Sequence, residues 1–194
     1  MERDVGKNMY EKLAEKYGMS LEQAKSNCRN IEQMAAEVGL NYQFDTMILT
    51  NTFDAHRLTM LAKSHGLMQE MTERLLRAYF TESKHIGDHA TLTELAVEIG
   101  LDRDEVAAML ASGDMSDEVR ADQQEAASIG VRSVPFFLIN RKYSLTGAQP
   151  TDVFVQALQQ VYSQDGPYEL DTDMGVDEGL SCDENGCEIP KKEK

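Results

Sequence analysis

The chain has 194 residues with 34 acidic and 19 basic side chains, which gives a formal net charge of −15 at pH 7. Nucleic acids and anionic membrane surfaces attract positively charged patches, so this charge argues against both as partners. No apolar run approaches the roughly 20 residues that a membrane-spanning helix needs. The first residues also lack the apolar core of a secretory signal, so we expect a cytoplasmic protein.

Helical patterns dominate the front of the chain. A first helix is predicted to end at Gly18, and the next begins at Ser20, which forms a capping-box pattern with Gln23. The segment 41–47 is too short to show a helical pattern and is interpreted as extended. The apolar residues of the second helix recur every three or four positions and predict one buried face; they are Leu21, Ala24, Cys28, Ile31, Ala35 and Val38.

The next helices are predicted from the same signals. His56 shares an apolar helix face with Phe53 and Met60, and we interpret it as a core histidine. Thr91 and Glu94 form a second capping-box pattern, which predicts a helix start. The two helices that follow are expected to begin at Asp102 and Ser116.

Within Ser133–Ile139, a proline directly precedes a run of apolar residues. Pro135 cannot donate a hydrogen bond to a sheet, so it belongs at the first position of a strand or at a bend. The cis form of an X–Pro bond costs only about 0.5–1 kcal/mol. We therefore predict a cis bond between Val134 and Pro135, a strand at 136–139, a returning strand at 143–146 and a last helix.

Four segments in chain order resemble the FrnE-like branch of the DsbA family: Thr50–Leu58, Leu75–Phe80, Gly130–Phe137 and Gly147–Pro150. The similarity runs from about residue 3 to residue 163. It implies an α/β protein with a DsbA-like thioredoxin fold that carries an inserted helical domain. It also implies a thiol–disulfide oxidoreductase or protein disulfide isomerase that acts on polypeptide thiols and disulfides and needs no cofactor.

The sequence departs from the family in one respect, because it contains no Cys-x-x-Cys pair. We therefore expect the strand–helix–strand unit that carries this pair to be missing, which leaves a predominantly helical protein with a small sheet. An uncovered edge of that sheet is expected to favour self-association. The expected parts are an entry helix at 1–19, the inserted helical domain at 20–112, the second half of the thioredoxin fold at 113–163 and an acidic tail at 164–194.

The resemblance transfers only a few site residues. Val134 and Pro135 match the cis-proline loop, which in the family holds the substrate polypeptide beside the reacting sulfur. Asp54 and His56 match the motif of the helical domain, but we can assign them no chemical step. No catalytic residue is assigned with security.

The three cysteines need separate explanations. Cys28 lies on an apolar helix face and is interpreted as a buried structural thiol. Cys182 and Cys187 flank an Asn-Gly turn signal, which can bring two thiols within bonding distance. Some FrnE-like proteins carry such a pair, so these two residues are the candidate accessory redox pair. Three acidic neighbours disfavour the thiolate, which leaves incidental thiols as the alternative.

No metal site is expected. Cys182 and Cys187 provide only two of the four ligands that zinc usually takes. His85 and His89 have the spacing of two ligands on one helix face, but Gly87 between them argues against a helix.

Three functions are compatible with these patterns. The first is a thiol–disulfide oxidoreductase of the DsbA family that is incomplete in this chain. The second is a non-catalytic remnant of the fold that binds polypeptides. The third is a glutathione-dependent isomerase of the related 2-hydroxychromene-2-carboxylate isomerase branch, which ranks last because Gly147–Pro150 differs from the segment usual in that branch.

Overall fold

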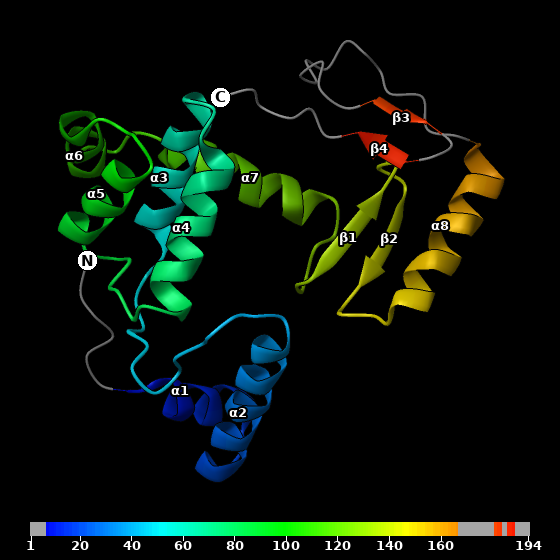
Figure 1. The fold of residues 1–194 in the computed structure, drawn as a ribbon, viewed down its shortest axis with the longest axis horizontal. Coiled ribbons are helices and arrows are strands. Elements are labelled where there is room, and N and C mark those ends of the chain that lie inside the picture. The colour runs from blue at the N-terminus through cyan, green and yellow to red at the C-terminus, as the bar shows by residue number, and fades with distance from the viewer. Residues whose placement is uncertain (1–6, 167–180, 184–185, 189–194) are drawn as a thin grey trace. The chain divides into compact units, whose positions relative to one another are not determined.

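The computed structural model describes residues 7–166, 181–183 and 186–188. The chain divides into two compact units, Met1–Ile129 and Gly130–Lys194 (Figure 1). Within the described residues, no helix is long and apolar enough to cross a membrane. The first unit contains α1 (Met9–Tyr17), α2 (Leu21–Glu37), α3 (Phe53–Ser64), α4 (Met68–Phe80), α5 (His89–Glu98), α6 (Arg103–Ala111) and α7 (Ser116–Ser128). The second contains β1 (Phe136–Ile139), β2 (Tyr143–Thr146), α8 (Thr151–Asp165), β3 (Ser181–Asp183) and β4 (Gly186–Glu188).

Local sequence sets the ends of the first two helices. Asn8 caps α1 and forms a capping box with Glu11, while Ser20 caps α2 and forms the predicted box with Gln23. Gly18 ends α1 with a left-handed φ of 64°, a conformation that glycine adopts without a steric penalty. Two of the helix boundaries predicted from the sequence are thereby confirmed.

Two other local predictions were wrong. The helix expected to start at Thr91–Glu94 begins at His89, because Asp88 is its cap and accepts a hydrogen bond from the Thr91 N–H at 2.8 Å. The Thr91 hydroxyl donates to the same carboxylate, so this residue supports the cap instead of forming it. The segment 41–47 contains a turn at 44–46 and no strand.

A first apolar cluster lies between α3, α4, α5 and α6. Its largest fully buried side chains come from all four helices and are Leu58, Met71, Leu92, Leu95 and Val106. α3 packs against α4, α5, α6 and α7, so it is the central helix of the unit. This position matters for the site, because α3 carries the Asp54 motif.

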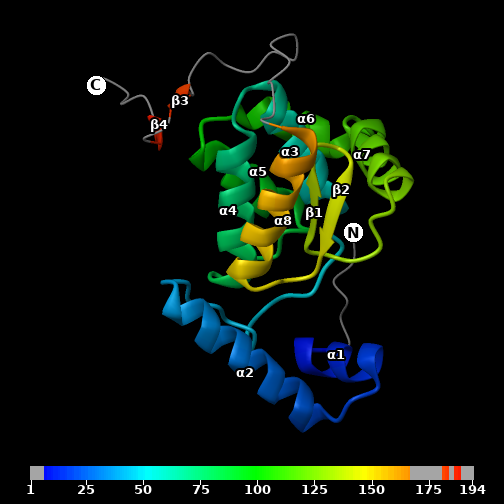
Figure 2. The ribbon, with the colours of Figure 1, turned by 90° about the vertical axis from the view of Figure 1, so that its right-hand side faces the viewer.

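A second, smaller cluster joins α1, α2 and the segment after them, which lie at one end of the first unit (Figure 2). Cys28 is buried in it beside Tyr10 and Phe44, so the prediction of a buried structural thiol is confirmed. Tyr79 of α4 packs against both clusters, and its ring meets that of Phe80 edge-on with centroids 5.1 Å apart.

The apolar face predicted for α2 is buried only in part. Ala24, Cys28 and Ala35 are buried, whereas Ile31 and Val38 are 46% and 75% exposed. α2 has 17 residues and α1, the helix that packs against it, has nine. The shorter helix covers only part of the longer one.

The second unit is built on an antiparallel hairpin. β1 pairs with β2 in the register Phe136↔Thr146 to Ile139↔Tyr143. Both strands lie at the residues predicted from the sequence. α8 packs on the hairpin through Phe154. The ring of Phe154 contacts that of Phe137 edge-on, with the ring centroids 4.7 Å apart. Within the described residues, this sheet has two strands, which agrees with the expectation of a small sheet.

Candidate functional site

The loop that leads into β1 has an unusual backbone. The Val134–Pro135 peptide bond is cis. The carbonyl oxygen of Pro135 accepts a hydrogen bond from the N–H of Gly147 at 2.8 Å, which ties the loop to the segment after β2. Gly147 has a φ of 85°, so it takes a conformation that other residues rarely adopt. Two of the segments singled out in the sequence therefore meet at this loop.

Val134 is strongly exposed in this loop, with 85% of its surface accessible. Within the described residues, the main-chain N–H and C=O of Val134 have no hydrogen-bond partner. A free donor and acceptor just before a strand are the groups with which an extended polypeptide pairs.

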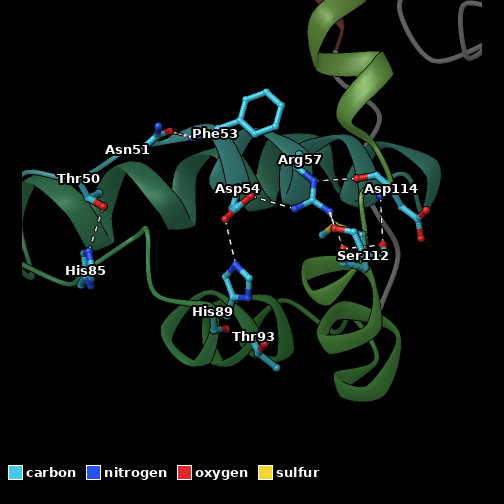
Figure 3. A network of polar contacts seen from close by, with 11 residues as sticks. Thr50, Asn51, Phe53, Asp54, Arg57, His85, His89, Thr93, Ser112 and Asp114 are labelled. Atoms are coloured by element: carbon cyan, nitrogen blue, oxygen red, sulfur yellow. Dashed lines mark hydrogen bonds and ion pairs between the residues drawn. The ribbon is translucent and has the colours of Figure 1, made fainter. Parts of the chain in front are cut away.

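A polar network in the first unit surrounds Asp54 (Figure 3). Arg57 Nη1 lies 2.9 Å from Asp54 Oδ1, and both side chains are almost fully buried. The same guanidinium donates to three carbonyl oxygens: Met109 at 2.6 Å, Ser112 at 2.8 Å and Asp114 at 2.8 Å. Arg57 thus fixes the segment that joins α6 to α7.

His89 completes the network on the other oxygen of Asp54. Its Nε2 atom lies 2.9 Å from Asp54 Oδ2, and its side chain is about half exposed. Burial alone would raise the pKa of the Asp54 carboxyl, but the hydrogen bonds and charges of His89 and Arg57 outweigh it and lower that pKa. Asp54 is therefore held as a carboxylate that links α3, α5 and the α6–α7 segment.

A second contact holds the loop before α5 against the start of α3. His85 Nε2 lies 3.0 Å from the Thr50 hydroxyl. A Cβ atom at Gly87 would collide with that hydroxyl and would lie 3.1 Å from the Asn51 carbonyl oxygen. Only glycine fits this position without movement of the neighbouring segment.

The structure corrects the interpretation of His56. This residue is exposed on α3 and is not a core histidine, whereas Asp54 and Arg57 on the same helix are buried. Sequence reasoning missed Arg57 and His89 as members of the network. The opposite charges of Asp54 and Arg57, three positions apart on an apolar helix, were the signal that could have found the ion pair.

The described residues offer no group of three or more histidine, cysteine or acidic side chains that could hold a metal ion. The buried charges of Asp54 and Arg57 are paired with each other. The network therefore serves to hold α3, α5 and the α6–α7 segment in position. Cys28 is buried, and burial together with the nearby Glu32 and Asp45 raises the pKa of its thiol. This thiol is a poor nucleophile at neutral pH.

Cys182 and Cys187 are brought together by the backbone. They lie opposite each other in the register of β3 and β4. Opposed residues in antiparallel strands have Cα atoms about 4.5–5.5 Å apart, which lies within the range that a disulfide spans. The positions of the two side chains are outside what the structure describes.

Comparisons with known proteins agree with this architecture. A probable DsbA oxidoreductase, SCO1869 of Streptomyces coelicolor, has a crystal structure that matches with a TM-score of 0.77 and 39% identity. The match covers 98% of this chain and 80% of that one. The uncharacterized protein YwbO of Bacillus subtilis (strain 168) is 30% identical over 131 residues, which are 66% of this chain and 65% of YwbO. The aligned part therefore spans less than two thirds of that relative's length.

The family model described as the DSBA-like thioredoxin domain matches residues 4–159. This range includes the Asp54 network, the cis-proline loop and the β1–β2 hairpin. The chain belongs to the family of DSBA-like thioredoxin domains.

Proposed function

We propose that this chain takes part in thiol–disulfide exchange on polypeptides, as a FrnE-like member of its family. The observation that carries the proposal is the exposed cis-proline loop, in which Val134 has an unpaired main-chain N–H and C=O among the described residues. An extended substrate segment would add to this edge by main-chain hydrogen bonds, while the Val134 side chain supplies an apolar contact.

The proposal assigns the attacking thiolate to a dithiol outside these 194 residues, because they contain no Cys-x-x-Cys pair. Cys182 and Cys187 are proposed as an accessory pair. A thiolate of the reduced pair attacks a substrate disulfide, and one substrate sulfur leaves as a thiolate. The second thiolate of the pair then attacks the mixed disulfide and releases the other substrate sulfur as a thiolate. The substrate disulfide is reduced, the pair is oxidised by two electrons to a disulfide, and reduced glutathione would restore it.

Rearrangement of substrate disulfides needs only one thiolate of the pair. This thiolate attacks a substrate disulfide and releases a substrate thiolate. A different substrate thiolate then attacks the mixed disulfide and releases the thiolate of the pair, so the chain is returned unchanged. We also propose a cytoplasmic setting, where reducing thiol pools would keep Cys182 and Cys187 mainly as thiols. The direction of exchange would then be reduction or isomerisation of substrate disulfides.

Binding to the loop can be tested without any redox step. An unfolded, alkylated polypeptide is titrated into the full chain, and amide resonances of residues 132–137 are followed by NMR. Val134→Asp is expected to weaken binding by about tenfold or more, because it places a charge at the apolar contact. Val155→Asp on α8, also an exposed valine, is the matched control and should leave the affinity unchanged.

Resonance shifts confined to the first unit, or equal affinities for the two variants, would reject the loop as the binding site. The non-catalytic alternative gives a different result. It predicts normal binding by the loop but no disulfide exchange, even when a separate protein with a Cys-x-x-Cys pair is added.

A further inference from the structure

The outer face of α4 carries a cavity that the function proposed above does not use. The cavity has a volume of about 320 Å³ and lies between α4 and the segment 39–42 that follows α2. We call it the α4 groove. Its lining includes Leu40, Tyr42, Glu73, Leu76, Arg77 and Phe80.

The helical repeat brings the α4 part of this lining together. Glu73, Leu76, Arg77 and Phe80 follow one another at steps of three, one and three positions, so they share one face of α4. The opposite face of the helix is buried in the first apolar cluster. The N–H of Gln43 donates to the carbonyl oxygen of Phe80 at 2.8 Å, which fixes the segment 39–42 beside the end of α4.

The walls of the α4 groove suit an aromatic side chain. The rings of Tyr42 and Phe80 stack with their centroids 4.8 Å apart and 23° between the ring planes. Leu40 and Leu76 are 45% and 49% exposed, so they add accessible aliphatic surface. Aromatic side chains gain most from flat apolar walls of this kind. The volume is at the lower end of the range of about 300–1,000 Å³ for small-molecule sites, which favours a single side chain as the guest.

Glu73 gives the α4 groove its charge. Among the described residues, the carboxylate of Glu73 has no ion pair or hydrogen bond. Arg77 already has an acidic partner, because its Nε atom lies 3.1 Å from Glu82 Oε1. The groove therefore offers one negative charge without a partner in the described part of the chain. The net charge of −15 of the whole chain also attracts basic polypeptides.

We propose that the α4 groove binds an aromatic side chain of an extended substrate polypeptide, while Glu73 pairs with a basic side chain two positions away from it. The proposal rests on the proposed function, which supplies polypeptide substrates. Glu73 lies about 7.5 Å along the helix axis from the midpoint between Leu76 and Phe80. Side chains two positions apart in an extended segment are separated by about 7 Å. The two spacings match.

Binding of short peptides to the full chain tests the proposal. The first peptide has a phenylalanine and a lysine two positions apart among serines and glycines, with a fluorescein label and no cysteine. In the second peptide glutamate replaces the lysine, and in the third alanine replaces the phenylalanine. Fluorescence anisotropy should find the first peptide bound most tightly. The glutamate peptide should bind about fivefold more weakly or worse, and the alanine peptide about tenfold more weakly.

Variants of the chain locate the binding site. Glu73→Lys should reverse the order of the lysine and glutamate peptides. Glu94→Lys makes the same change of charge at an exposed position of α5 outside the groove, so it is the matched control and should keep the order. Leu76→Asp should weaken binding of the first peptide by about tenfold or more. All three residues are exposed, and melting temperatures equal to that of the wild type would show that the variants remain folded.

The outcomes separate this proposal from the proposed function. Equal affinities for the three peptides, or an unchanged order in Glu73→Lys, would overturn the α4 groove. Binding that is lost in Val134→Asp but not in Leu76→Asp would place the peptides on the cis-proline loop, which rejects the groove and keeps the proposed function. Binding that depends on Glu73 and Leu76 in a chain that exchanges no disulfides would support the groove and reject the proposed function alone.

Discussion

Asp54 and Arg57 form an ion pair at 2.9 Å whose side chains are only 6% and 5% exposed. A buried charge without its partner is costly, because neither water nor an opposite charge then compensates it. The ion pair on α3 therefore stabilises the packing of the first unit. Through Arg57 it reaches three carbonyl oxygens between Met109 and Asp114.

Replacement of Asp54 should be strongly destabilising. Asp54→Asn removes the charge that compensates Arg57, and we expect the free energy of unfolding to fall by about 3 kcal/mol. His89→Asn is the control, because the His89 side chain is about half exposed and its pair with Asp54 should contribute about 1 kcal/mol or less. Urea unfolding followed by circular dichroism measures both. Equal losses for the two variants would contradict the ranking.

The same ion pair predicts a dependence on acid. The folded protein lowers the pKa of Asp54, so this group stabilises the fold above its unfolded pKa, near 3.9, and the contribution is lost as pH falls through the folded pKa. The difference in unfolding free energy between wild type and Asp54→Asn should be constant from about pH 5 to pH 7. It should shrink below about pH 4. A difference of the same size at pH 3 and pH 7 would refute this account.

Gly87 should tolerate no larger residue. In Gly87→Ala the added methyl group meets the Thr50 hydroxyl and the Asn51 carbonyl oxygen, and we expect a loss of about 1–3 kcal/mol. Gly113→Ala is the matched control, because the space around Gly113 is open. The double variant Gly87→Ala, Thr50→Ala should recover part of the loss, since it removes the hydroxyl. Thermal unfolding of the wild type, the two single glycine variants and the double variant measures these differences. Similar melting temperatures for Gly87→Ala and Gly113→Ala would contradict the prediction.

Disulfide reduction by this chain alone should be slow. The described residues place no thiol of lowered pKa near Pro135, and the sequence has no Cys-x-x-Cys pair. Insulin turbidity with dithiothreitol should therefore rise at nearly the uncatalysed rate. Any small acceleration should disappear when Cys182 and Cys187 are both replaced by serine. Fast turnover in that double variant would make Cys28 the reactive thiol and would contradict the site proposed above.

Cys28 should react only when the first unit opens. Its thiol is buried and burial raises its pKa, so both access and thiolate content are low. In the variant that lacks Cys182 and Cys187, labelling with iodoacetamide should be slower by about a hundredfold or more in buffer than in urea. Comparable rates in the two solvents would mean that this thiol is accessible in the folded protein.

Most helices could be predicted from local sequence patterns. The predictions were wrong where the structure depends on residues that are distant in the sequence. Ser20 and Gln23 predicted a helix start correctly, because both partners of the cap lie within one turn. Thr91 matched the same pattern, but the helix begins earlier, because the side chain of Asp88 caps it and accepts a hydrogen bond from the Thr91 N–H. Ile31 fits the apolar pattern of α2 but is 46% exposed, because the shorter helix α1 covers only part of α2. No pattern within α2 can reveal this.

The candidate site was predicted unevenly for the same reason. Val134 and Pro135 stand next to each other in the chain, so their loop was visible in the sequence, and the cis bond agrees with the prediction. Asp54 was singled out, but its partner His89 lies 35 positions away and comes near it only through the packing of α5 on α3. Long-range pairs of this kind need the tertiary structure.

The position of Tyr79 between two apolar clusters bears on how the first unit unfolds. The two apolar clusters of this unit are separate groups of buried residues, and Tyr79 packs against both. Two cores that consist of different buried residues can open one at a time, since each retains its own buried contacts when the other is lost. In hydrogen exchange, the amides of α1 and α2 should then form one cooperative group that opens at a lower free energy than the amides of α3 to α6.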